Sequence, residues 1–72
     1  MENENDRIAV VLIALIELIK ERGIQDSGTD VGDFCNQLAE EAIAQADAYG
    51  VSLERLGLDN VDTNAMLMPK NL

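Results

Sequence analysis

The chain lacks most of the residues on which small proteins depend for catalysis, metal binding or covalent stabilisation. Its 72 residues include no His and no Trp, and only one each of Cys, Pro, Phe and Tyr. Without His, the usual general base near neutral pH is missing and the common zinc ligand sets cannot be assembled. We therefore expect no enzymatic activity, no cofactor and no metal site.

The single cysteine, Cys35, cannot form a disulfide within the chain. An unpaired thiol fits a reducing compartment better than a secreted setting, so we expect a cytoplasmic protein. A chain this short buries only about 60% of the surface that its unfolded form exposes. Since disulfides and metals are excluded, a second subunit is the remaining common source of stability, and we expect a homo-oligomer, most simply a dimer.

Basic residues are also scarce. The chain has 5 Lys and Arg but 14 Asp and Glu, which gives a formal net charge of −9. Phosphate neutralisation by Lys and Arg supplies most non-specific affinity for nucleic acid, so we expect no direct binding to nucleic acid. The apolar run at 8–19 would span about 18 Å as a helix, against about 30 Å for a bilayer core. It also follows an acidic start, unlike a signal peptide, so we expect no membrane association.

The chain does have strong helical periodicity in its first third. Asn5 or Asp6 can cap a helix, and Gly23 can end it. Apolar residues between them recur in the i, i+3, i+4, i+7 pattern of a core-facing helix. This predicted core face consists of Ile8, Val11, Leu12, Leu15, Ile16 and Ile19.

Three further apolar residues of this helix fall outside that face or widen it. Val10 and Ile13 point the opposite way, and Leu18 extends the main stripe. We predict that Val10, Ile13 and Leu18 form a self-association surface. The alternative is that they are scattered exposed apolar residues of the kind that every protein surface carries.

A second amphipathic helix is predicted from a cap at Thr29 or Asp30 to about Tyr49, where Gly50 ends it. Residues 23–29 have turn chemistry and join the two helices as an antiparallel pair. The predicted buried stripe of the second helix consists of Val31, Phe34, Cys35, Leu38, Ala42, Ala46 and Tyr49.

The remainder of the chain contains only short elements. Ser52 can cap a helix over 53–56 that Gly57 stops, and one further turn is expected after Thr63, ended by Pro69. The sequence therefore predicts a single all-α domain over 1–72, with the ends 1–5 and 70–72 frayed. Its architecture is a helical hairpin with a short third helix and an irregular C-terminal segment, assembled as a dimeric helical bundle.

The most distinctive polar feature is a segment of one charge sign, since residues 23–54 contain seven acids and no Lys or Arg. Asp33, Glu40 and Asp47 repeat every seven residues, about 10.5 Å apart along a helix, and Asp30 and Glu41 flank them. This acidic row predicts a small inhibitor or adaptor, of the phage-inhibitor or nucleic-acid-mimic kind, that docks on a basic protein surface. The alternative is a purely structural self-assembling module whose charge serves solubility.

Two other motifs fit poorly. A calcium loop starting at Asp26 would need Gly and Glu where the chain has Val31 and Gln37. The spacing over 46–56 suits a helix-turn-helix, but its second helix would be acidic and would end at Gly57. A helix that ends in a glycine cap explains the same residues.

Overall fold

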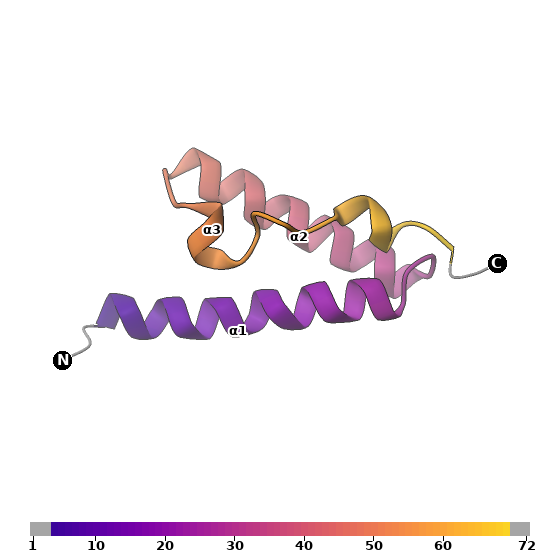
Figure 1. Cartoon of the computed structure of the whole chain (residues 1–72), viewed down its shortest axis with the longest axis horizontal. Coiled ribbons are helices and arrows are strands. Elements are labelled where there is room, and N and C mark those ends of the chain that lie inside the picture. The colour runs from indigo at the N-terminus through magenta and orange to yellow at the C-terminus, as the bar shows by residue number, and fades with distance from the viewer. Residues whose placement is uncertain (1–3, 70–72) are drawn as a thin grey trace.

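The protein is a hairpin of two long helices on which the C-terminal part of the chain packs as a third layer (Figure 1). The computed structural model describes residues 4–69. Its elements are α1 (Glu4–Gln25), α2 (Asp30–Ala48), α3 (Leu53–Leu56) and the 3-10 turn η1 (Thr63–Met66). The described residues contain no strand, which confirms the all-α class with two main helices and a short third one. The dimer stays a prediction.

Helix α1 is longer than predicted at both ends. It includes Glu4 and Asn5, which were expected to be frayed, whereas the same expectation for 1–3 and 70–72 lies outside the described residues. The prediction that Gly23 ends the helix is wrong. Gly23 is buried inside α1, where an added Cβ would lie 2.5 Å from Met66 Sδ. It therefore permits a close approach of Met66.

The caps of the other elements agree with the sequence. Thr29 precedes α2 and its side chain accepts a hydrogen bond from the Gly32 amide at 3.4 Å. Ser52 accepts from the Arg55 amide at 3.3 Å, and Gly57 ends α3 in the left-handed region at φ 75°. These positions confirm the predicted starts of α2 and α3 and the predicted end of α3.

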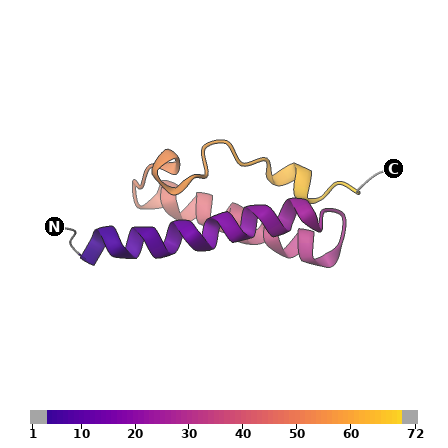
Figure 2. The same ribbon diagram turned by 60° about the horizontal axis from the view of Figure 1, so that its bottom comes forward.

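The C-terminal segment, residues 53–69, runs back along one side of the hairpin toward the α1–α2 loop (Figure 1 and Figure 2). Lys20 Nζ of α1 donates to the Gly57 carbonyl at 2.8 Å. Asn36 Nδ2 of α2 donates to the Thr63 carbonyl at 2.8 Å. Near the loop, the Gly28 amide donates to the Met66 carbonyl at 3.1 Å. The segment is therefore bonded to both helices and to the loop between them.

The buried side chains form two small clusters between these three layers. The first consists of Ile16, Ala46, Leu56 and Leu58, and the second of Cys35, Ala39 and Met66. Ile13, which was predicted to point away from the core, packs partly buried against the first cluster. That prediction is wrong because the C-terminal segment supplies a layer on the side of α1 where Ile13 lies.

The predicted core face of α1 is also largely wrong. Ile16 is buried and Ile19 is half-buried, but the other four residues of that face are exposed, namely Ile8, Val11, Leu12 and Leu15. On α2, Cys35 and Ala46 are buried as predicted, whereas Val31, Phe34, Leu38 and Tyr49 are exposed. The core lies toward the C-terminal segment. The buried side of each helix therefore faces this segment, and most of the large apolar residues lie outside that side.

Candidate functional site

The most prominent surface feature is a set of exposed apolar side chains on the hairpin, which we call the open face. On α1 it consists of Ile8, Val11, Leu12, Leu15 and Leu18. On α2 it consists of Val31, Phe34, Leu38 and Tyr49.

Helical geometry places both groups on the same side of the hairpin. At 100° per residue, Leu12 and Leu15 lie to one side of the buried Ile16, and Lys20, which bonds the C-terminal segment, lies to the other. On α2, Leu38 and Asn36 are likewise on opposite sides of the buried Ala39. Because the helices are antiparallel, the two sides that face away from the C-terminal segment coincide. The segment thus covers one side of the hairpin and leaves the open face uncovered.

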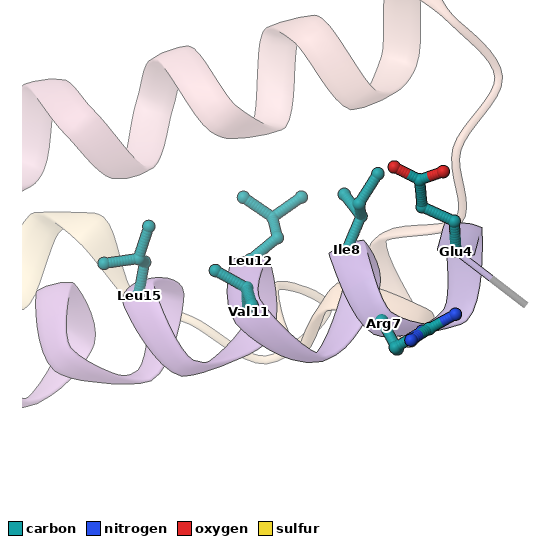
Figure 3. Close-up of a pocket in the computed structure, with 6 residues that line it drawn as sticks. All are labelled: Glu4, Arg7, Ile8, Val11, Leu12 and Leu15. Carbon is teal, nitrogen blue, oxygen red and sulfur yellow. The ribbon is translucent and has the colours of Figure 1, made fainter. Parts of the chain in front are cut away.

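Two shallow grooves mark this face. One follows α1 and is lined by Glu4, Arg7, Ile8, Val11, Leu12 and Leu15 (Figure 3). Figure 3 shows Ile8, Leu12 and Leu15 in a row along the helix, with Glu4 at the end of the row. The other groove lies between the helices, and its lining includes Leu12, Gln45 and Tyr49. Leu12 belongs to both grooves, so the apolar surface of α1 continues into the space between α1 and α2.

Burial of this surface would contribute a free energy that is large for so small a protein. The five aliphatic side chains of α1 are each about half exposed, and full burial of one such side chain contributes about 1.5–3 kcal/mol. Covering the α1 part of the open face would contribute roughly 4–8 kcal/mol per chain. Net stabilities of folded domains are about 5–15 kcal/mol, so this term is comparable with the stability of the whole molecule.

The predicted self-association residues do not form one surface. Leu18 is on the open face, Ile13 packs against the core, and Val10 is exposed on the other side of α1. Sequence periodicity had identified four of the five α1 residues of the open face, but as core. What it could not show is which side the C-terminal segment covers.

The acidic row is exposed throughout, at Asp30, Asp33, Glu40, Glu41 and Asp47. Two of its members are engaged within the chain. Glu40 accepts a hydrogen bond from the Thr63 hydroxyl, and Glu41 accepts from Gln45 Nε2 at 2.7 Å. Asp33, Glu40 and Asp47 lie on the side of α2 toward the C-terminal segment. These three residues therefore lie on a different side of the hairpin from the open face, whereas Glu41 lies beside it, bonded to Gln45 of the groove between the helices.

Cys35 is buried in the second cluster, with its side chain close to Gly23 and Met66. Residues 4–69 contain no group of three or more Cys, Asp or Glu side chains placed to hold a metal ion. Within that range, no helix has both the length and the apolar character needed to cross a membrane.

Comparison of the chain with models of protein families, with curated proteins and with solved structures finds no match.

Proposed function

We propose that this chain is a non-enzymatic protein-interaction module that associates with another helical surface through its open face. The observation that carries the proposal is the exposed apolar surface of α1 and α2, in which Leu12 joins the groove along α1 to the groove between the helices. Exposed apolar surfaces of this kind are typical of protein interfaces. The unpaired thiol of Cys35 supports a reducing compartment, the cytoplasm, as its location.

Two neighbouring valines provide a matched test. Val11 lies on the open face and is 62% exposed, whereas Val10 lies outside it and is 60% exposed. The tagged wild-type chain should elute from a native cell extract in a complex larger than the tagged monomer, of which the 72 residues contribute 7.8 kDa. Val11→Asp should shift it to the monomer position, because a carboxylate cannot be buried without a partner. Val10→Asp should elute like the wild type.

Two results would contradict this proposal. One is a wild-type chain that elutes as a monomer in every extract. The other is an equal shift of Val11→Asp and Val10→Asp to the monomer position, because equal shifts would indicate unfolding or a binding surface other than the open face.

A second candidate function uses the acidic row instead. Here the chain is an acidic inhibitor or adaptor, in the manner of a nucleic-acid mimic, that docks on a basic protein surface. Its support is the exposure of all five carboxylates of the row together with the absence of any Lys or Arg in residues 23–54. Since Asp33, Glu40 and Asp47 lie on a different side from the open face, the two functions are compatible.

Charge reversal tests this second candidate. Glu40→Lys with Asp47→Lys should weaken binding to an immobilised arginine-rich peptide by about tenfold or more in 0.1 M salt. Glu21→Lys with Asp59→Lys changes the net charge equally outside the row and is the control. Equal losses for the two pairs would mean that net charge alone, rather than the row, attracts the cationic probe.

A further inference from the structure

We propose that the partner on the open face is a second copy of this chain, with α1 packed antiparallel against α1 of the partner subunit. In this arrangement Glu4 of each copy lies opposite Arg22 of the partner subunit. The proposal rests on the proposed function and specifies its partner, orientation and register.

The first support is the spacing of the exposed stripe on α1. Glu4, Ile8, Val11, Leu15, Leu18 and Arg22 follow one another at intervals of four, three, four, three and four residues. Alternation of three and four is the pattern of a helix that packs lengthwise against another helix. Read in either direction, the intervals are the same, so two antiparallel copies align around a two-fold axis at the level of residue 13.

The alignment matches each residue of the stripe with a suitable counterpart. Ile8 faces Leu18 of the partner subunit, and Val11 faces Leu15 of the partner subunit. Each of these four side chains is between 53% and 62% exposed in the single chain, so all four have surface to bury.

The second support is the charge at the two ends of the stripe. Glu4 and Arg22 are separated by eighteen residues, which are five helical turns, so both lie on the line of the exposed stripe. The end at Glu4 is acidic and the end at Arg22 is basic. Antiparallel pairing of two copies places opposite charges together at both ends.

The same charges disfavour a parallel pair. Parallel alignment would place Glu4 against Glu4 of the partner subunit and Arg22 against Arg22 of the partner subunit, and like charges at such positions oppose association. The two ends of the stripe therefore select the antiparallel orientation.

Disulfide trapping tests the orientation directly. In a Cys35→Ala background, Glu4→Cys and Arg22→Cys would be made as separate variants. Residues 4 and 22 are about 27 Å apart along α1, whereas a disulfide requires Cα atoms within about 7 Å. Under mild oxidation, a mixture of the two variants should therefore give a covalent dimer, and neither variant alone should do so. Self-linking of the Glu4→Cys variant would overturn the antiparallel orientation.

Charge exchange provides an independent measurement in solution. Glu4→Arg alone and Arg22→Glu alone should each raise the Kd of the dimer by about tenfold, because each creates two like-charge contacts. The double variant should return to within about threefold of the wild-type Kd, since its contacts are again complementary. Losses that accumulate in the double variant would overturn the pairing of Glu4 with Arg22 of the partner subunit.

Failure of this inference is distinguishable from failure of the proposed function. If the purified chain is a monomer and gives no trapped dimer, the second copy is excluded as the partner. In that case a complex in cell extracts that is lost with Val11→Asp and retained with Val10→Asp would still support an interaction module that binds another protein.

Discussion

Residues with little or no side chain determine how closely the layers of this protein approach one another. Gly32 is buried in the first turn of α2, where an added Cβ would lie 2.6 Å from the Met66 carbonyl oxygen and 2.7 Å from that of Asp26. Both atoms belong to the backbone, so they cannot move aside as a flexible side chain can. The lack of a side chain at Gly32 thereby allows η1 and the α1–α2 loop to pack against the start of α2.

Gly32→Ala should therefore destabilise the fold by about 2–3 kcal/mol, despite the higher helix propensity of Ala, because the new methyl group overpacks a backbone junction. Gly50→Ala is the control. Gly50 has φ 69° and nothing lies within 4 Å of an added Cβ, so Ala there should cost only about 1–2 kcal/mol, which is the cost of the left-handed conformation. Urea unfolding followed by circular dichroism would compare the two, and a larger loss at Gly50 would contradict the close contact at Gly32.

Single residues also show how far the sequence could predict the structure. The caps at Thr29, Ser52 and Gly57 were predictable, because each cap depends on local hydrogen bonds or on a local backbone angle. Gly23 was misinterpreted as a helix end, since a glycine that ends a helix and one that admits a neighbouring side chain have the same local pattern. Only the position of Met66, more than forty residues later, distinguishes the two roles.

The C-terminal segment is the element on which the arrangement of the whole hairpin depends. It lies against α1 and α2 on one side, and it supplies Leu56, Leu58 and Met66 to the two core clusters. The periodicity of α1 identifies the apolar residues of that helix. It cannot show that the C-terminal segment covers the side of α1 toward Ile13 and Lys20. For that reason the fold class was predictable, whereas the buried side of α1 was not.

Met66→Ala should accordingly destabilise the protein by about 2–5 kcal/mol, because it leaves a cavity where a fully buried side chain was packed. Met68→Ala is the matched control, since Met68 is 61% exposed and its loss should change the free energy of unfolding by less than about 0.5 kcal/mol. Equal effects in urea unfolding would show that η1 does not contribute to the core.

The whole molecule has two unlike surfaces on a small core. The open face is apolar and is uncovered within the single chain, and Asp33, Glu40 and Asp47 of the acidic row are exposed on a different side of the hairpin. The sequence predicted the acidic row correctly as an exposed feature, because a charged repeat on an amphipathic helix needs no tertiary information. It also predicted apolar association through α1, which stays a prediction; the structure exposes Ile8, Val11, Leu15 and Leu18 together on the open face, whereas Val10 and Ile13 lie elsewhere on the helix.

Sedimentation equilibrium of the purified chain tests the central claim most directly. Coverage of the open face by a second copy predicts a mass of twice 7.8 kDa for the wild type and for Val10→Asp at micromolar concentration. It predicts the monomer mass for Val11→Asp, with circular dichroism confirming that this variant keeps its helices. A wild-type chain that remains folded at the monomer mass over the whole concentration range would contradict the claim.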